Sequence, residues 1–406
     1  MKQAYFTCAS WLRTRKAQAE SAQQLTTRRE KLWQALQPAI ARTPALQEFA
    51  NTPLQNFPVF LPHQLREDIG QWNSCDIGHA QAHAAAEAAE KGEVALLGNC
   101  ISAGYSTGTS GVRGLFMASP KERAIYLGQA LAKLLPLQSL FGARVLLFLR
   151  ADNALYSGGR LFSLTHCSLT ATAEEKQRIA EQVNPTILIA PPHVLAELSR
   201  RQTRLPALRH CFYGAEPMGD AEALWITHVL GIRPLPIYQA TEGFLAAPCH
   251  HGRLHLNEDS ITIEWEAVKG TLGHQIIVTD LQRHTQPIVR VKLDDFIEHD
   301  SAPCPCGFGG SVIRPIAGRV QDIWRFAKQT VTPRMVTKLL EAELGASAEW
   351  KAIASPEGIQ LLLNKTTSHD AAQQAAATLS RFAAVHMAEL HEPPYPKRRR
   401  VEWRAS

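Results

Sequence analysis

The chain has 406 residues, of which 45% are hydrophobic and 20% charged, a composition typical of a globular protein with one large and one small domain. Its net charge of +6 comes from Lys and Arg residues scattered along the chain, which argues against a nucleic-acid-binding protein and favours an anionic small ligand. No run approaches the ~18 apolar residues of a membrane span, and the residues after Met1 lack the apolar core of a secretion signal. We therefore expect a cytoplasmic protein without a membrane span, whose eight cysteines remain reduced.

The first half of the chain predicts helices, followed by strands that alternate with helices. The Gln-, Arg- and Leu-rich residues 17–36 and the Ala-rich residues 79–91 predict helices. Further on, strands are expected at residues 144–149 and 186–190, and helices at residues 176–182 and 193–201. This alternation predicts a parallel sheet that helices cover on both faces.

The pattern changes after residue 243. Strand-like runs separated by turn residues, at 261–268, 274–281 and 287–299, predict an antiparallel β subdomain. A Gly- and Pro-rich segment follows, and residues 333–344 and 371–390 then predict helices. We expect an α/β fold with a large N-terminal domain of residues 1–318 and a small, mobile α+β domain of residues 319–406.

A loop rich in glycine and hydroxyl residues predicts a phosphate site. Residues 105–114 read YSTGTSGVRG. Glycines allow backbone N–H groups to converge on an anion, the hydroxyls add donors, and Arg113 adds a positive charge. It is not a Walker loop, because no Gly-Lys-Ser/Thr follows. A flexible Ser/Gly linker has a similar composition, so the loop needs support from other motifs.

Three further motifs follow the loop in a fixed order, at residues 213–217 (YGAEP), 237–243 (IYQATEG) and 316–322 (IAGRVQD). The series resembles that of the adenylate-forming superfamily, in particular its phenylacetate-CoA ligase and coenzyme F synthetase-like branch. The resemblance extends from Phe57 almost to the C-terminus. It implies an enzyme that uses ATP and Mg²⁺ to convert a carboxylic acid into an acyl-AMP and then transfers the acyl group to a thiol.

The resemblance implies a nucleotide-binding role for each motif. The loop would enclose the β- and γ-phosphates, with Arg113 where the family usually has Lys. The turn at residues 214–217 would line the adenine, and Tyr238 would stack on it. The nucleotide-binding residues implied in this way are Ser106, Thr107, Gly108, Thr109, Ser110, Gly111, Arg113, Gly214, Ala215, Glu216, Pro217, Tyr238, Gln239, Asp295 and Arg319.

Three residues carry the catalytic roles that the resemblance implies. Thr241 would bind the α-phosphate, and Glu242 would help to hold Mg²⁺, since a carboxylate suits a hard cation. Lys397, in the segment PKRRRV, would stabilise the charge that develops during adenylation. For the arginines after it, a solvated basic tail is the alternative interpretation.

The ribose and hinge positions match the family pattern more loosely. Asp295 would bind the ribose, but Asp294 is an alternative, because the segment RVKLDD departs from the usual family sequence. Arg319 would contact the ribose or a phosphate. Related enzymes usually have two acids at the hinge, and Gln321 replaces one of them here, so Asp322 is the hinge candidate.

A Cys-x-Cys turn predicts a structural zinc site. Together with an upstream Cys and His, this turn offers three thiolates and one imidazole, which could bind zinc tetrahedrally. The four predicted ligands are Cys249, His255, Cys304 and Cys306. Some members of the resembled branch have a comparable arrangement, which implies that the zinc is structural. His250 or His251 could replace His255, and free cysteines that pack as small apolar residues are the alternative to metal binding.

The sequence says less about the carboxylic acid substrate and about the thiol that accepts the acyl group. The branch commonly uses aryl acids, so we expect an aromatic or other hydrophobic acid in a pocket near Phe212, Tyr213, Tyr238 and Ala240. The acceptor would be coenzyme A or the phosphopantetheine of an acyl carrier protein, and a homodimer is left open. One alternative is an adenylyltransferase that places AMP on a hydroxylated cofactor. Another is a zinc-bearing nucleic-acid-binding protein, built around the Cys-x-Cys turn and residues 397–400.

Overall fold

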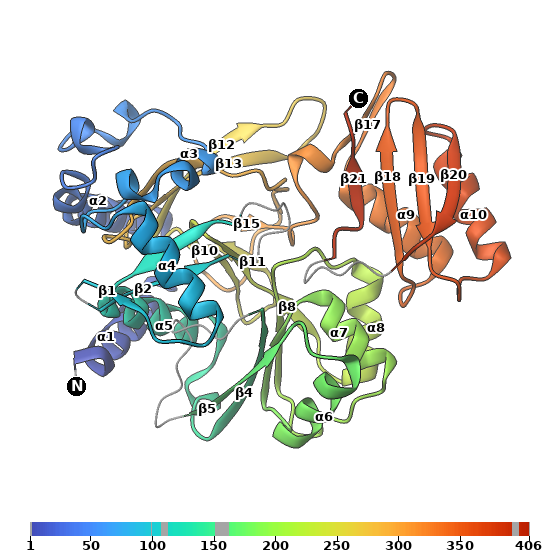
Figure 1. Ribbon diagram of the computed structural model, residues 1–406, viewed down its shortest axis with the longest axis horizontal. Helices are drawn as coiled ribbons and strands as arrows, with labels where there is room; N and C mark the ends of the chain where they lie inside the picture. The colour runs from blue at the N-terminus through green and yellow to red at the C-terminus, as the bar shows by residue number, and fades with distance from the viewer. Residues whose placement is uncertain (1, 99, 107–112, 151–161, 392–397, 406) are drawn as a thin grey trace.

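The computed structural model describes residues 2–98, 100–106, 113–150, 162–391 and 398–405. Figure 1 shows several sheets and their helices in the larger part of the molecule, with a separate unit at the C-terminal end beside them. Within the described ranges, every helix is too short or too polar to cross a lipid bilayer.

A parallel sheet forms the centre of one part of the large unit, as predicted. Its strand order is β5-β4-β6-β7-β8. Helices α6, α7 and α8 pack on one face, where Leu146, Leu188 and Leu195 are fully buried in one apolar cluster. The bounds are β4 Ala143–Leu149, β5 Phe162–Ser168, β6 Ile187–Ala190, β7 His210–Tyr213, β8 Pro234–Pro236, α6 Ala173–Val183, α7 Pro192–Arg200 and α8 Asp220–Leu230.

Antiparallel sheets follow along the chain, which confirms the predicted change of architecture. One has the order β15-β11-β10-β9 and the other the order β12-β13-β14. The third predicted strand, at residues 287–299, is shorter than expected, because regular pairing ends at Lys292 and only isolated bridges follow. The bounds are β9 Tyr238–Ala240, β10 Gly243–Pro248, β11 Leu254–Leu256, β12 Ile261–Ala267, β13 His274–Asp280, β14 Ile288–Lys292 and β15 Val312–Ile313.

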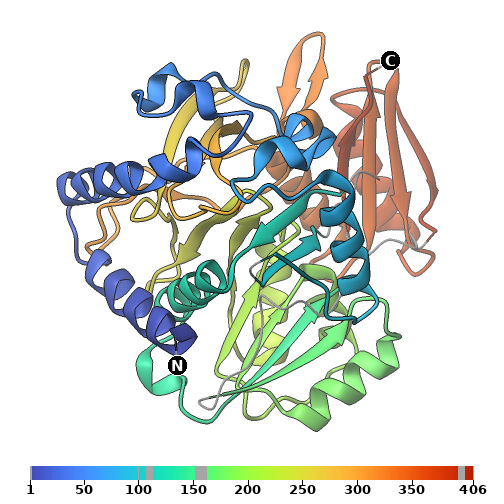
Figure 2. The same cartoon turned by 60° about the vertical axis from the view of Figure 1, so that its left-hand side comes forward.

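The N-terminal region adds helices and a small sheet. The predicted helix at residues 17–36 is in fact the second of two, because Ser21 caps a new helix and forms a capping box with Gln24. The first helix, α1, packs on α5, where a Cβ at Gly128 would lie 2.4 Å from the Thr7 carbonyl oxygen (Figure 2). The bounds are α1 Lys2–Ala17, α2 Ala22–Ile40, α3 Pro62–Glu67, α4 His79–Glu90, α5 Pro120–Leu134, β1 Leu96–Leu97, β2 Ile101–Tyr105 and β3 Leu115–Ala118.

The C-terminal unit has its own core, in which Trp324 and Trp350 are fully buried. The predicted helix at residues 333–344 is α9. The predicted helix at residues 371–390 is wrong in its second half: α10 ends at Ser380, and the chain then pairs with β19 as a parallel strand. The bounds are β16 Trp324–Phe326, β17 Gln329–Val331, α9 Pro333–Leu344, β18 Trp350–Ser355, β19 Gly358–Leu363, α10 His369–Ser380, β20 Val385–Glu389 and β21 Val401–Trp403.

Candidate active site

A cavity of about 1160 Å³ lies where the parallel sheet, the antiparallel sheets and the C-terminal unit meet. The chain leaves the carboxyl end of β8 and enters β9 here, and ligands commonly bind at such an edge of a parallel sheet. The predicted residues that line it are Ser106, Gly214, Ala215, Glu216, Pro217, Tyr238, Gln239, Thr241, Glu242, Asp295 and Arg319. The predicted residues Thr107, Gly108, Thr109, Ser110, Gly111 and Lys397 lie outside the described residues.

The base of the predicted phosphate loop contacts Thr241. The Ser106 N–H donates to the Gly114 carbonyl oxygen at 2.7 Å, and the Gly114 N–H donates to Ser106 Oγ at 3.0 Å. A Cβ at Gly114 would lie only 2.8 Å from Thr241 Oγ1. The absence of a side chain at residue 114 therefore lets two motifs far apart in sequence touch.

Arg113 pairs with two residues that line the cavity but does not line the cavity itself. Its guanidinium forms an ion pair with Glu90 of α4 and lies 4.3 Å from the centre of the Tyr105 ring. The described cavity lining includes Glu90 and Tyr105 but not Arg113. A role of Arg113 in phosphate binding would therefore require it to exchange this carboxylate for a phosphate.

The turn after β7 has an unusual backbone conformation. Ala215 has a φ of 70°, in the left-handed region that costs a residue with a side chain about 1 kcal/mol. The carboxylate of Glu216 is buried, contacts His193 Nδ1 at 2.7 Å and accepts the Arg398 N–H at 2.6 Å. Glu216 thus joins α7 to the C-terminal segment, and the residues of the turn line the cavity.

The aromatic and acidic residues predicted to hold the nucleoside contact each other. The Tyr238 hydroxyl donates to Asp295 Oδ2 at 2.7 Å. Burial and the nearby Asp295 raise the pKa of Tyr238 well above its ordinary value, so the phenol stays protonated and remains a donor. Asp295 also forms a backbone bridge with Arg319, whereas Asp294 is exposed at the edge of the cavity. Of the two candidate acids, Asp295 is the more buried and is the one that accepts the Tyr238 hydroxyl.

Thr241 and Glu242 form the two-residue tip of the β9–β10 hairpin, where Ala240 pairs with Gly243. Arg283 steadies this tip by donating to the Thr241 carbonyl oxygen at 2.5 Å. Burial raises the pKa of Glu242 and Asp295 adds to this effect, whereas Arg283 and Arg66 lower the pKa. A cation next to the Glu242 carboxylate would favour its ionised form.

The arginines after residue 397 are not a solvated tail. Arg399 forms an ion pair with Asp322, the predicted hinge residue, which is 3% exposed. Arg398 and Arg400 both contact Glu222 on α8, whose side chain is fully buried. These three arginines are therefore paired with carboxylates, and they do not form the free basic surface that a nucleic-acid-binding protein needs.

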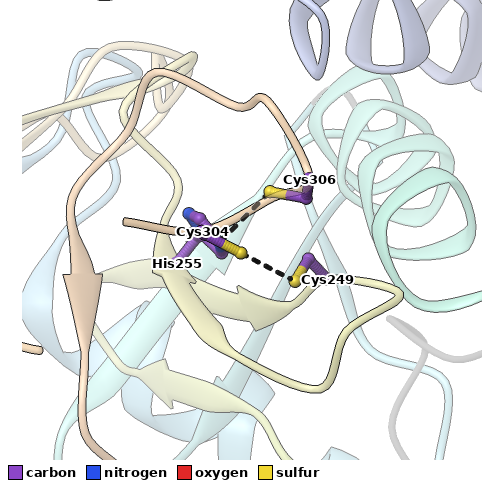
Figure 3. Close-up of side chains that lie close together, drawn as sticks. All are labelled: Cys249, His255, Cys304 and Cys306. Carbon is purple, nitrogen blue, oxygen red and sulfur yellow. Dashed lines mark hydrogen bonds between the residues drawn. The ribbon is translucent and has the colours of Figure 1, made fainter. Parts of the chain in front are cut away.

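The predicted zinc ligands come together at the far end of β10 (Figure 3). Cys249 Sγ lies 3.7 Å from Cys304 Sγ, and Cys306 Sγ lies 3.4 Å from His255 Nε2. All four ligand atoms lie within 4.8 Å of one another. A tetrahedral zinc ion would place its ligand atoms roughly 3.3–3.8 Å apart, so the donor set and its spacing fit zinc.

The orientation of His255 also suits a metal ligand. Its Nδ1 lies 3.3 Å from the Gly310 carbonyl oxygen, which leaves Nε2 to face the cysteines. Burial lowers the pKa of His255, so the ring is neutral at pH 7. The ring centres of His250 and His251 lie 4.1 Å apart with the ring planes tilted by 44°, and neither residue belongs to the group of four.

One part of the cavity is lined by apolar side chains. They come from α5 and from the face of the parallel sheet opposite α6 to α8, and they follow β6 from Ala190 to Ile187, a distance of about 10 Å at 3.3 Å per residue. The main members are Leu131, Leu134, Val145, Leu147, Phe162, Leu164, Ile187, Ile189 and Phe212. Of the four predicted pocket residues, Phe212 belongs to this part.

Several lining residues have no signal in the sequence. Arg66 and Arg283 supply cations near Glu242, and Glu341 of the C-terminal unit supplies a carboxylate. Glu222 of α8 lies outside the lining and pairs with Arg398 and Arg400. None of them belongs to a motif, and each reaches the site through contacts between distant segments. Only the requirement that buried arginines have acidic partners could have suggested the two glutamates.

No family model matches the chain, and no curated protein matches it in sequence. Solved structures do match. A 2-hydroxyisobutyryl-CoA ligase in the postadenylation state, in complex with R3-HIB-AMP, has a TM-score of 0.68 at 14% identity, covering 96% of this chain and 91% of that chain. The same ligase with 2-HIB-AMP and CoA in the thioesterification state has a TM-score of 0.55 at 16% identity, covering 95% and 91%.

The anthranilate CoA ligase AuaEII in complex with anthranoyl-AMP has a TM-score of 0.54 at 15% identity, covering 75% of this chain and 67% of that chain. The TM-score is larger for the ligase in the postadenylation state than for the same ligase in the thioesterification state. The predicted α/β architecture is confirmed. This chain has the fold that these adenylate-forming CoA ligases share.

Proposed function

We propose that the protein is an AMP-forming ligase that activates a hydrophobic carboxylic acid with ATP and transfers the acyl group to a thiol. The observation that carries this proposal is the convergence of the motif residues. The loop base at Ser106 and Gly114, the hairpin tip at Thr241 and Glu242, and the pair of Tyr238 and Asp295 all meet at one cavity.

In the adenylation step, a carboxylate oxygen of the acid attacks the α-phosphorus of ATP, the bond to pyrophosphate breaks, and acyl-AMP forms. Thr241 would hold the α-phosphate, while Tyr238 and Asp295 would hold the adenosine. Lys397 would stabilise the negative charge on the attacked phosphate. Glu242 would hold Mg²⁺, which would screen the charge of the phosphates.

The apolar part of the cavity supports a hydrophobic acid. A carboxylate near Thr241 would let the rest of the acid extend along the sheet face between α5 and β6. Burying an apolar tail there is favourable by about 25 cal/mol per Å². An aromatic acid fits this lining, as does an aliphatic one of similar length, and the anthranoyl-AMP bound to AuaEII is aromatic.

In the second step, the sulfur of a thiol attacks the acyl carbon, and the bond from that carbon to the AMP oxygen breaks. The thiol would belong to coenzyme A or to the phosphopantetheine of a carrier protein. We place the boundary of the mobile C-terminal domain at residues 318 and 319, and the core of that unit begins at Trp324. Asp322 remains the hinge candidate.

Zinc would be structural in this account. Cys249 lies six residues after Gly243 along β10, about 20 Å from the hairpin tip at 3.3 Å per residue. The ligands Cys249, His255, Cys304 and Cys306 would hold the ion, and it would join β10, β11 and the loop before β15. At this distance the ion cannot touch the reacting phosphate.

The proposal is tested by acid-dependent exchange of labelled pyrophosphate into ATP. The panel comprises acetate, 2-hydroxyisobutyrate, phenylacetate, benzoate and octanoate. We expect exchange with the apolar acids, little with the two small ones, and loss of exchange in Lys397→Ala. Exchange that requires a hydroxylated cofactor instead of an acid would favour the adenylyltransferase, and no exchange with any acid would refute the ligase.

A further inference from the structure

Glu222 occupies the third position of α8, five residues after the turn predicted to line the adenine, and its side chain is fully buried. Both carboxylate oxygens contact guanidinium groups of the C-terminal segment. Oε1 lies 2.8 Å from Arg398 Nη1 and 3.3 Å from Arg400 Nη2. Oε2 lies 2.9 Å from Arg398 Nη2 and 3.2 Å from Arg400 Nη1. One buried carboxylate thus holds two guanidinium forks, an arrangement we call the α8 clamp.

The same end of α8 receives a second carboxylate from the C-terminal unit. Glu341 of α9 accepts the Ala221 N–H at 3.1 Å. Gly219 stands at the N-cap position, and a Cβ there would lie 1.7 Å from Glu341 Oε1. Glu341 therefore occupies the place of a capping side chain and satisfies a free N–H of the first turn. Both contacts join the large unit to the C-terminal unit.

The clamp fixes the segment that follows Lys397. The Arg398 N–H donates to Glu216 at the turn after β7, and Arg399 pairs with Asp322. The Arg400 carbonyl oxygen accepts the Ala352 N–H at 2.8 Å, which leads the chain into β21. The three arginines are thus held from both sides. The chain as a whole has a larger TM-score with the 2-hydroxyisobutyryl-CoA ligase in its postadenylation state, 0.68, than in its thioesterification state, 0.55.

Glu222 is the carboxylate that stabilises the two buried guanidinium groups of the clamp. Two guanidinium groups held next to each other in a buried place repel each other and lose hydration, and their shared carboxylate compensates both effects. Other acids lie farther away, with Glu349 at 3.6 Å from Arg398 and Glu341 at 3.9 Å from Arg400. A neutral residue at position 222 would leave excess positive charge buried between the two units, and separating the units would relieve it.

We propose that Glu222 is a positioning residue that holds residues 398–400, which directly follow the predicted catalytic residue Lys397, in the arrangement used for adenylation. This inference rests on the proposed ligase function. It predicts that Glu222 acts on the first half-reaction and not on the second, since the clamp must open if the units rearrange for the thiol. A residue needed only for folding would affect both half-reactions.

The test compares Glu222→Gln, which preserves the shape of the side chain, with the control Glu197→Gln. Glu197 pairs with Lys176 at 3.0 Å within the helices α6 and α7, and that pair does not involve the C-terminal unit. Arg398→Met removes one of the two guanidinium partners of Glu222. This variant is used for the test if the Glu222→Gln protein does not fold. Adenylation is followed by pyrophosphate exchange with phenylacetate or octanoate, and the second step by mixing synthetic acyl-AMP with CoA.

We expect exchange turnover to fall at least tenfold in the clamp variants, with the CoA step changed less than twofold and the control unchanged. Small-angle scattering should show a more extended particle for the clamp variants than for the wild type. Equal loss of both half-reactions, or a scattering profile identical to that of the wild type, would overturn the proposal. If the wild-type protein shows no acid-dependent exchange, the ligase proposal fails, and the scattering comparison alone decides on the clamp.

Discussion

Substitution of Gly114 by alanine tests how the phosphate loop and the hairpin tip depend on each other. The added Cβ would lie 2.8 Å from Thr241 Oγ1 and 3.1 Å from Thr241 Cγ2. The shorter contact is about 0.7 Å inside the 3.5 Å at which non-bonded atoms attract best. Gly114 is not among the residues with a positive φ, so alanine can adopt its backbone conformation without strain. Any loss of activity in Gly114→Ala would therefore come from the contact with Thr241.

The size of the effect follows from where the strain is relieved. Overpacking by one methyl group costs about 1–3 kcal/mol, and Thr241 lies at a hairpin tip that can shift more easily than the sheets below it. A displacement of roughly 1 Å at a group that positions the substrate costs about 100-fold in rate. We therefore expect the kcat for acid-dependent pyrophosphate exchange to fall by about 10- to 100-fold, with a small decrease in melting temperature.

The matched control is Gly78→Ala at the start of α4. Its nearest neighbour, Gln81 Oε1, would lie 3.7 Å from the new Cβ, which is ordinary contact. This variant should keep the wild-type exchange rate. A folded Gly114→Ala protein whose exchange rate stays within about twofold of the wild type would refute the idea that the loop base positions Thr241.

Three other predictions concern the nucleoside pair, the zinc site and a buried acid. Tyr238→Phe keeps the ring but loses the 2.7 Å bond to Asp295, so the KM for ATP should rise about tenfold with kcat nearly unchanged; a fall in kcat alone would contradict this. Cys304→Ser should lower the zinc content below the one ion per chain expected for the wild type and reduce the melting temperature, whereas Cys75→Ser, which changes an exposed cysteine, should do neither. Burial raises the pKa of Asp280 to about 6, whereas the same carboxyl in the unfolded chain has a pKa near 4. As the pH rises from about 4 to above 6, ionisation of Asp280 therefore lowers the free energy of unfolding, by up to roughly 3 kcal/mol. Asp280→Asn should therefore gain stability over the wild type as the pH rises from 4.5 to 7.5 in denaturant titrations, and a pH-independent difference would show that Asp280 does not titrate there.

The sequence predicted the architecture where local signals were strong. Apolar runs at β4 and β6 and the alternating strands β12 and β13 were recognisable because burial on two faces or on one face leaves its own pattern. The Ala-rich stretch before residue 380 misled the prediction for β20, since its strand character depends on pairing with Gly358–Leu363 and not on its own composition. Long-range pairing of this kind leaves little trace in a local pattern.

In the candidate site too, features with a local sequence signal could be predicted, and features that depend on long-range contacts could not. Motif residues such as Thr241 and Asp295 could be placed from their order along the chain. The ion pair of Arg113 with Glu90 and the pairing of the terminal arginines with Glu222 could not be predicted, because each arises from tertiary contacts between segments more than 20 residues apart. His255 was one of three candidate histidines, and the strand β11 selects it by burying its ring beside the cysteines.

Transfer of oxygen from the acid to AMP tests the central claim most directly. The protein is incubated with ATP, CoA and phenylacetate or octanoate labelled with ¹⁸O in the carboxylate, and the AMP is examined by mass spectrometry. If the acid attacks the α-phosphorus and the thiol then attacks the acyl carbon, each AMP gains one labelled oxygen. AMP without label, or label in inorganic phosphate with ADP as the product, would contradict an acyl-adenylate mechanism.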